Sequence, residues 1–435
     1  MKYFNYRALC LSLIFIPSLS YSAIIEWKEN IPSALKPFQN NSTELASITK
    51  DQILIYAHPN TQTSIPTRKK HPNPNVKFTS SAIVLPVNEE KVAKTLSQFE
   101  NFVGLFPTLK SAKILDQEKN ITQVQYKISI PTPIPVLNFN ETIVFQHHIE
   151  GNSISSLIVD APVPYGLGKF EWFKLDQNHT LLTLTQWGDL NQPKGFLFSK
   201  VLNAVPEAKM GIPSGTHTFL LESIRKKLTA PSSSTLKPGQ FPSDQLTTNQ
   251  LAKIAQISRI TEHPVSFVHT PTTVPYQHGA ESMRFVTTYQ YYSQPVQQLQ
   301  KWTQPVHYKK LFPRQLKSIG IESLKDQTQL ADFKVELGLG VIQIPFRFKL
   351  NFSFPQSNQN NFYAQGGDLK YIKGKMQFDK FQQGTLLKMT NAGKIDEKAP
   401  FLIRAARSLP YHDVLPTVGA NVVFALKVKN EEQKQ

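Results

Sequence analysis

The sequence has a single cysteine among 435 residues, and charged residues make up only 18% of it, against 40% hydrophobic residues. This low charge density excludes a chain that is disordered throughout and a long coiled coil. No apolar run reaches the roughly 18 residues that a transmembrane helix needs. Gly-rich phosphate loops, Gly-x-Ser-x-Gly and His-Glu-x-x-His motifs are also missing, as is an RNA-binding aromatic signature. At about 150 residues per domain, the length predicts two or three packed domains.

The first 22 residues are typical of a cleavable signal peptide. Lys2 and Arg7 form a basic start, residues 8–17 are apolar, and Ser20-Tyr21-Ser22 places small residues where a signal peptidase cuts. Cleavage after Ser22 removes Cys10, so the mature chain has no thiol and no disulfide. We therefore expect an exported protein, in a bacterial periplasm or secreted by another cell type.

Basic residues outnumber acidic ones, 48 Lys+Arg against 31 Asp+Glu, and the excess lies in the C-terminal half. Residues 76–228 hold 15 cations and 13 anions, whereas residues 265–435 hold 22 and 12. A basic surface attracts polyanions or anionic membranes. Because an exported protein rarely meets nucleic acid, the sequence predicts no nucleic-acid partner. Transient docking on an anionic membrane and a simple contribution to solubility both remain open.

One pattern occurs twice in the sequence, and the matched positions keep their order at a spacing of 204 to 210 residues. A repeat of this length indicates a duplicated domain, because solenoid repeats have periods of about 20 to 50 residues. The matches are Leu105-Phe106-Pro107 with Leu311-Phe312-Pro313, Ile134-Pro135 with Ile344-Pro345, Gly168-Lys169 with Gly374-Lys375, Thr180-Leu181-Leu182 with Thr385-Leu386-Leu387, Phe196-Leu197 with Phe401-Leu402, and Gly215 with Gly419.

The repeat and the composition divide the chain into five parts. A Ser-, Thr-, Pro- and Gln-rich stretch after Ala230 is typical of a linker. The predicted parts are a signal peptide over 1–22, an N-terminal preamble over 23–75, a first domain over 76–228, a linker over 229–264 and a second domain over 265–435.

Within each copy the pattern predicts a strand, short helices, several strands and a long final helix. Asn88 is placed to cap a helix over 89–102. Strict alternation over 124–130, 333–339 and 344–354 is typical of antiparallel strands with one apolar face. The final helix is amphipathic over 219–228. We also expect Gly211-Ile212-Pro213 to break a helical stretch over 196–210, so that the C-terminal element is either kinked or in two parts.

These features resemble the START-like superfamily, which includes polyketide cyclases, coenzyme Q-binding proteins and Bet v 1-like proteins. The resemblance rests on the two Phe-Pro pairs, on Gly168-Lys169-Phe170-Glu171-Trp172, and on the glycines near the final helices, Gly215 and Gly419. It covers roughly 320 residues in two blocks. It implies an α+β fold of two helix-grip domains, each a curved antiparallel sheet around a long C-terminal helix with an apolar cavity between them.

The aromatic row of the second copy is the most suggestive ligand-binding feature. Phe346, Phe348, Phe352 and Phe354 share one strand face, which suits a flat or long apolar ligand. These rings can equally fill a core. The predicted ligand-binding residues are Tyr126, Ile128, Phe139, Trp172, Leu337, Phe346, Phe348 and Phe352.

Two glycine-containing segments, 162–168 and 365–368, are predicted to connect strands where such folds open their cavity. Glycine there permits hinge motion, and an ordinary strand connection is the alternative. The predicted gating residues are Tyr165, Gly166, Gly168, Gly366 and Gly367.

Support for catalysis is thin, and we expect no metal and no cofactor. His147 and His148 are neighbours on a predicted strand, so they point to opposite faces and cannot bind one metal together. Glu171 is a candidate buried acid, but a solvated or Lys-paired side chain is the more common arrangement. The matched position in the second copy is Gln377, so the two domains do not share such an acid.

The sequence therefore favours a binding protein over an enzyme. The leading hypothesis is a monomeric exported carrier for a lipid, fatty acyl compound, quinone or polycyclic molecule that docks on an anionic membrane. One alternative is a cyclase- or dehydrase-like enzyme, which requires convergent polar groups in one cavity. The other is a non-enzymatic adaptor with collapsed cavities.

Overall fold

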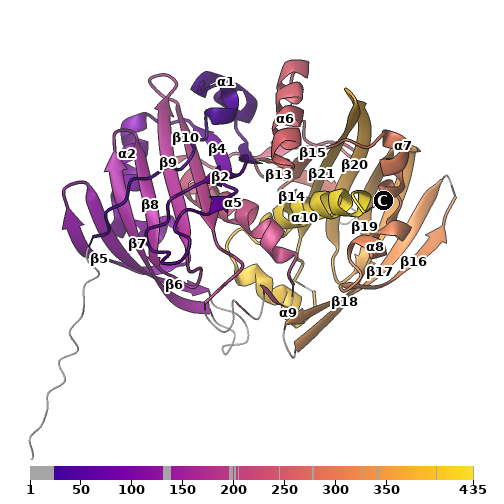
Figure 1. The fold of residues 1–435 in the computed structure, drawn as a ribbon. Helices are drawn as coiled ribbons and strands as arrows, with labels where there is room; N and C mark the ends of the chain where they lie inside the picture. Colours follow the sequence, from indigo (N-terminus) through magenta and orange to yellow (C-terminus); the bar gives the residue numbers. More distant parts are fainter. Residues whose placement is uncertain are drawn as a thin grey trace, which may run out of the picture.

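The computed structural model describes residues 24–130, 139–194, 199, 202–203, 205–243, 245–276, 279–325, 327–339, 342–397 and 399–434. The predicted signal peptide lies outside these residues. Two similar halves flank a central pair of helices (Figure 1). The helices are η1 (Lys36–Phe38), α1 (Ser42–Thr49), α2 (Glu89–Ser97), η2 (Phe99–Asn101), α3 (Phe102–Leu105), α5 (Ala208–Leu228), α6 (Thr248–Thr261), α7 (Val296–Leu299), η4 (Gln300–Thr303), η5 (Pro305–His307), α8 (Tyr308–Leu311), α9 (Phe401–Arg404), η6 (Ala405–Ser408) and α10 (Leu415–Glu432).

The first half carries ten strands among the described residues. They are β1 (Ile53–Ala57), β2 (Thr61–Gln62), β3 (Asn75–Val76), β4 (Thr79–Leu85), β5 (Leu109–Glu118), β6 (Ile121–Ile130), β7 (Phe139–Glu150), β8 (Ser153–Asp160), β9 (Gly166–Lys174) and β10 (Thr180–Gly188). The strands of the second half are β11 (Ser234–Thr235), β12 (Val265–Val268), β13 (Thr272–Tyr276), β14 (Gly279–Met283), β15 (Val286–Tyr292), β16 (Leu316–Ser323), β17 (Thr328–Leu339), β18 (Ile342–Gln356), β19 (Gln359–Gly367), β20 (Tyr371–Phe381) and β21 (Gly384–Lys394).

Sixteen of these strands form one continuous sheet, in the order β16-β17-β18-β19-β20-β21-β15-β12-β1-β4-β10-β9-β8-β7-β6-β5. The two halves of this order are equivalent. Strands β5 to β10 of the first copy correspond to β16 to β21 of the second, β4 corresponds to β15, and β1 corresponds to β12. The two halves join where β1 pairs antiparallel with β12, with Leu54 opposite Phe267 and Ile55 opposite Ser266. The domains are therefore fused edge to edge through their sheets, and the predicted connection by a flexible linker is wrong.

The predicted linker is in fact the start of the second copy. Residues 248–261 form helix α6, which begins with a capping box at Thr247 and packs on the same core as α1. Residues 24–41, the N-terminal strap, cover the outer face of the first half, where Ile31 packs with Phe78. Leu236 and Phe241 pack in the corresponding way on Phe285 in the second half. The preamble and the linker are thus equivalent parts of two complete copies.

Each half grips a long helix against the inner face of its sheet. Helix α5 packs on β4 and α10 packs on β15 and β21, and the two helices pack on each other (Figure 1). Helix α5 runs from Ala208 to Leu228 with Pro213 inside it, so the alternative of a two-part element divided at 211–213 is wrong. Helix α2 is capped by Asn88, as predicted, but ends at Ser97.

Strand alternation places the core as the sequence predicts. Val124 and Tyr126 of β6 lie in the first inner core, with Ile154 of β8 and Leu221 of α5. The two copies also repeat small polar contacts. Thr180 donates to the Val87 carbonyl at 2.8 Å, and Thr385 donates to the Gln294 carbonyl at 2.7 Å. The α+β helix-grip architecture predicted from the sequence is confirmed in both halves.

Candidate functional site

A cavity of about 500 Å³ lies in the first domain, between the sheet and helix α5. Strands β6 to β10 supply its walls, and the first turns of α5 cover it. Such a volume suits a drug-sized or lipid-like ligand. The lining side chains that matter below are Phe102, Phe106, Tyr126, Ile128, Phe145, His147, Ser156, Gly168, Phe170, Leu184, Pro213 and Phe219.

The walls are mostly apolar because every second residue of these strands points inward and most of these inward-facing residues are aliphatic or aromatic. Phe145 and Phe170 come from β7 and β9, and Phe219 comes from α5, where its ring stacks near Phe106 with centroids 6.5 Å apart. No carboxylate of the described residues lines the cavity. Displacing water from such a surface is favourable by about 25 cal/mol per Å² of apolar area.

Three hydrogen-bonded polar side chains lie within this lining, which also includes Lys77, Thr79, Thr108, Lys169, Gln186 and Thr216. His147 lies directly opposite Ser156 in the β7–β8 ladder, and its Nδ1 is 2.8 Å from the Ser156 Oγ. Its Nε2 is 3.1 Å from the hydroxyl of Tyr126 on β6. All three side chains line the cavity. They form a continuous chain of hydrogen bonds from Tyr126 through His147 to Ser156.

The environment of His147 keeps its imidazole neutral. The side chain is only 5% exposed, and its ring stacks on Phe99 with centroids 4.3 Å apart. Burial lowers the pKa of His147 to about 3, and burial also raises the pKa of Tyr126 well above its ordinary value. At neutral pH both groups are therefore uncharged hydrogen-bonding partners.

The predicted ligand-binding residues of the first domain do not all line the cavity. Tyr126 and Ile128 line the cavity. Trp172 is not among the lining residues and packs in the inner core, 5% exposed. Phe139 begins strand β7 opposite Ile130, and its side chain lies outside the described set.

In the second domain the predicted residues pack on one another. Phe348 stacks on Phe333 with centroids 5.0 Å apart, and on Phe346 at 6.0 Å. Phe352 is 1% exposed and joins the same cluster, against which Leu337 also packs. The rings of this row therefore contribute to a packed aromatic core.

The predicted gating segment of the first domain, 162–168, comprises the connection between β8 and β9 and the first three residues of β9. Gly166 and Gly168 belong to β9, and Gly168 lines the cavity. A Cβ on Gly166 would lie 2.5 Å from a methyl group of Ile158. Tyr165 packs on the outer core, with Arg68 over its ring at 5.6 Å. Pro162 and Val163 of the connection line the cavity, and hinge motion of this segment stays a prediction.

The second gating segment is the end of a strand as well. Gly366 and Gly367 close β19, where the pairing with β18 shifts register between Lys349 and Leu350. Gly367 has a φ of +94°, which L-residues rarely adopt, and its would-be Cβ overlaps the Arg347 carbonyl. Gln365 is the extra residue of a β-bulge beside these glycines, and their role in gating stays a prediction.

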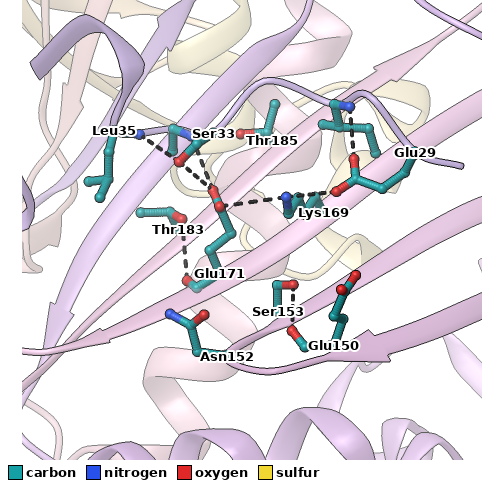
Figure 2. A network of polar contacts seen from close by, with 12 residues as sticks. Glu29, Ser33, Leu35, Glu150, Asn152, Ser153, Lys169, Glu171, Thr183 and Thr185 are labelled. Carbon is teal, nitrogen blue, oxygen red and sulfur yellow. Dashed lines mark hydrogen bonds and ion pairs between the residues drawn. The ribbon is translucent and has the colours of Figure 1, made fainter. Parts of the chain in front are cut away.

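Glu171 follows Phe170 on β9 and therefore points to the opposite side of the sheet from that cavity residue, toward Ser33 and Lys169 (Figure 2). Its carboxylate accepts from the Ser33 hydroxyl at 3.0 Å and from the Ala34 N–H at 3.2 Å, and lies 3.7 Å from the Lys169 ammonium. Lys169 also pairs with Glu29 at 2.7 Å. Glu171 therefore holds the N-terminal strap and is not placed for chemistry in the cavity.

Other histidines make structural contacts. His58 bonds to Ser80 at 2.7 Å, and His269 bonds to Thr287 at 2.8 Å in the equivalent place of the second copy. Within the described part of the chain, no cluster of three or more His, Cys, Asp or Glu forms a metal site. Among the same residues, no helix has the length and apolar character needed to cross a membrane.

Sequence reasoning missed His147 and Ser156 as cavity residues. It placed His147 and His148 on opposite faces, which is correct, since His148 bonds outside to Asn120 at 2.7 Å. The alternation of Ile154, Ser156 and Ile158 also marks Ser156 as facing the same side as two apolar residues. Whether His147 or His148 faces the cavity depends on how strands β6, β7 and β8 pair with one another.

Comparison with known proteins finds related shapes but no close relative. No family model matches the chain, and no curated protein matches it. The chain is similar to the di-domain ARO/CYC protein StfQ from the steffimycin biosynthetic pathway, at 11% identity and a TM-score of 0.25, over 82% of this chain and 99% of that one. It is similar to the di-domain ARO/CYC protein BexL from the BE-7585A pathway, at 9% identity and a TM-score of 0.26, over 82% and 98%.

A third similar structure is a STAR-related lipid transfer protein fragment from Xanthomonas axonopodis, at 15% identity and a TM-score of 0.28, over 40% of this chain and 93% of that one. These TM-scores are low, so the assignment rests on the topology described above. The chain contains two helix-grip domains in tandem. The first of them encloses a cavity suited to a hydrophobic ligand.

Proposed function

We propose that this protein binds and carries an apolar ligand in the cavity of its first domain. The observation that carries the proposal is the cavity of about 500 Å³ with aromatic and aliphatic walls under α5. The ligand class is a lipid, fatty acyl compound, quinone or polycyclic molecule. Release of water from apolar surface drives the binding.

The test is native mass spectrometry of residues 23–435, purified gently, before and after organic extraction. A co-purifying apolar mass that extraction removes is expected. Gly168→Leu should abolish it, because the Cβ position at Gly168 meets atoms no closer than 3.8 Å and the longer side chain enters the cavity. Gly215→Leu is the matched control, since nothing lies within 4 Å of its Cβ position and Gly215 does not line the cavity. A protein that is empty and takes up no fluorescent fatty acid, quinone or phospholipid contradicts the proposal.

We further propose that the second domain docks on an anionic membrane. The support is a basic cluster around α8, in which Lys309, Lys310, Arg314 and Lys317 are exposed beside Val306, itself 57% exposed. The corresponding segment of the first domain, 100–110, carries one anion and one cation. Cations near an anionic surface contribute about 1 kcal/mol each.

Co-sedimentation with vesicles tests this docking. Binding to phosphatidylglycerol vesicles, its absence on phosphatidylcholine vesicles and its loss in high salt are expected. Lys309→Glu with Lys310→Glu should abolish it. The matched control changes Lys226 and Lys227, two exposed cations of the first domain, in the same way. Equal loss from both double variants would attribute binding to net charge alone.

Export and oligomeric state complete the proposal. The basic start and apolar run of the first 22 residues support transport into the periplasm, and N-terminal sequencing of protein from the periplasmic fraction should begin at Ala23. We propose a monomer, for which native mass spectrometry should give one chain per particle.

The cyclase- or dehydrase-like alternative gains support from the chain Tyr126–His147–Ser156, which supplies polar groups inside the cavity. The mass of a bound ligand separates the two functions. A carrier returns its ligand unchanged, whereas a dehydrase returns it lighter by one water. The adaptor alternative predicts no ligand at all.

A further inference from the structure

The three hydrogen-bonded residues Tyr126, His147 and Ser156 of the cavity all correspond to phenylalanines in the second copy. The strand registers fix the equivalence: His147 lies opposite Ser156, and Phe352 lies opposite Phe362. Likewise Tyr126 lies opposite Ile143, and Phe333 opposite Phe348. The equivalent pairs are Tyr126 and Phe333, His147 and Phe352, and Ser156 and Phe362, each about 206 residues apart.

The second copy therefore demonstrates that the fold does not need these polar groups. There Phe352 packs against Phe362 with centroids 5.5 Å apart. A Cβ on Gly374 would overlap the Phe362 ring, whereas the equivalent Gly168 borders the cavity. Phe362 thus occupies the space that is open above Gly168. Because an apolar trio satisfies the architecture, the cost of burying a polar trio in the first copy points to a role in binding.

The number of N–H and O–H protons in the Tyr126–His147–Ser156 hydrogen-bond chain determines whether a donor is left for a ligand. A neutral histidine has one N–H, and Tyr126 and Ser156 have one O–H each, which makes three protons. The two hydrogen bonds of the chain use two of them. If His147 donates from Nε2 to Tyr126, the tyrosine O–H is free. If it donates from Nδ1 to Ser156, the serine O–H is free. In either tautomer one end donates outward.

Resting on the proposed function, we infer that Tyr126, His147 and Ser156 form a subsite for one uncharged oxygen acceptor of the ligand, a ketone or quinone carbonyl. The ligand is then an apolar ring or chain that carries a carbonyl group and places no charge at this subsite. A carboxylate there is disfavoured because its charge would be buried against three uncharged groups. Lys77 and Lys169 also line the cavity, but the Lys77 ammonium donates to the Thr261 carbonyl at 2.8 Å and the Lys169 ammonium pairs with Glu29 at 2.7 Å. The neutral His147 suits a neutral acceptor.

The test compares two probes of one shape, fluorenone, which has a ring carbonyl, and fluorene, which lacks it. One hydrogen bond from the subsite should make fluorenone bind about five- to tenfold more tightly, measured by calorimetry with the full mature chain. The carbonyl stretching frequency of bound fluorenone should fall relative to its value in hexane. Equal affinity of the two probes with an unshifted carbonyl frequency overturns the inference and leaves the proposed function standing.

The deciding variant combines Tyr126→Phe, His147→Phe and Ser156→Ala. The first two changes introduce the residue type of the second copy, and alanine is used at Ser156 because a phenylalanine there would fill the cavity. It should bind fluorene as the wild type does, lose the preference for fluorenone and lose the frequency shift. A retained preference overturns the subsite. Tyr126→Phe and Ser156→Ala alone locate the donating end, because only one of them should remove the shift.

Tyr308→Phe is the matched control, since this buried tyrosine of the second domain lies 3.4 Å from the Asn360 amide and outside the cavity lining. It should change neither affinity nor frequency. If the wild type binds neither probe and co-purifies with no apolar mass, the proposed function fails, and the subsite fails with it. If the triple variant does not fold, the carbonyl stretching frequency of fluorenone bound to the wild type still tests whether the carbonyl accepts a hydrogen bond.

Discussion

Gly211 of α5 and Gly419 of α10 meet where the two gripping helices cross. A Cβ placed on Gly211 would lie 2.8 Å from the Cα of Gly419 and 3.1 Å from its carbonyl oxygen. The helices approach this closely because neither glycine carries a side chain. The crossing connects the cavity cover of the first domain to the core of the second.

Gly211→Ala should therefore destabilise the protein, by about 1 to 3 kcal/mol, because the helices must separate or shift to admit the methyl group. Chemical denaturation gives the free energy of unfolding. Gly215→Ala is the control on the same helix. Nothing lies within 4 Å of its Cβ position, so it should stabilise by roughly 0.5 to 1 kcal/mol through helix propensity. Equal effects of the two variants would refute the crossing.

Acid should unfold the protein in the range where its buried histidines take up protons. Burial lowers the pKa of His58 to about 4, and those of His147 and His217 to about 3. The unfolded chain, with a histidine pKa of about 6.5, binds these protons first. Stability that is present above pH 6.5 is thus lost as the pH falls, at about 1.4 kcal/mol per pH unit for each histidine.

His147→Phe tests this assignment, because the second copy has Phe352 at that position. Its unfolding free energy, measured from pH 7 to pH 5, should fall less steeply than that of the wild type, by about 1.4 kcal/mol per pH unit. Tyr126→Phe removes the hydroxyl partner of His147 but keeps the imidazole, and should leave the slope unchanged. A wild-type slope in His147→Phe would contradict a buried neutral imidazole.

Glu171→Ala should release the N-terminal strap without affecting the cavity. The change removes the acceptor of the Ser33 hydroxyl and of the Ala34 N–H. We expect a loss of about 1 to 3 kcal/mol and faster hydrogen exchange at Ala34. Glu171→Gln retains an acceptor oxygen, and Gln377 stands at the equivalent position of the second copy. The unfolding free energy of Glu171→Gln should therefore lie between those of the wild type and Glu171→Ala. Loss of ligand with an intact strap would instead place Glu171 in the binding site.

The two domains should unfold together. The β1–β12 ladder, the α5–α10 crossing and the ion pair of Arg284 with Glu222 at 3.1 Å all join them. Leu299→Ala, in the core of the second domain, should cost about 2 to 5 kcal/mol. Calorimetry should then give one transition at a lower temperature, with exchange accelerated in both halves. Two separate transitions, with only the second half affected, would argue for independent domains.

Much of the fold was predictable from the sequence because local patterns encode it. The alternation in β6 and β18, the cap at Asn88 and the ordered repeat each depend on neighbours within one element or on internal similarity. The boundaries were harder. The stretch 229–264 is polar at its start, as linkers are, yet α6 and its neighbours pack on the β1 core as the opening of a second copy.

The sequence alone determined two helix-grip copies and an apolar inner face, since both follow from periodicity and repetition. Tertiary structure decided which side chains meet across the strands. The rings of the four-phenylalanine row pack on one another and on Phe333 and Phe362, which the neighbouring strands β17 and β19 supply. In the first copy the strands bring Tyr126, His147 and Ser156 together in the lining of a cavity. Such cross-strand neighbours depend on register, which no single segment of the sequence records.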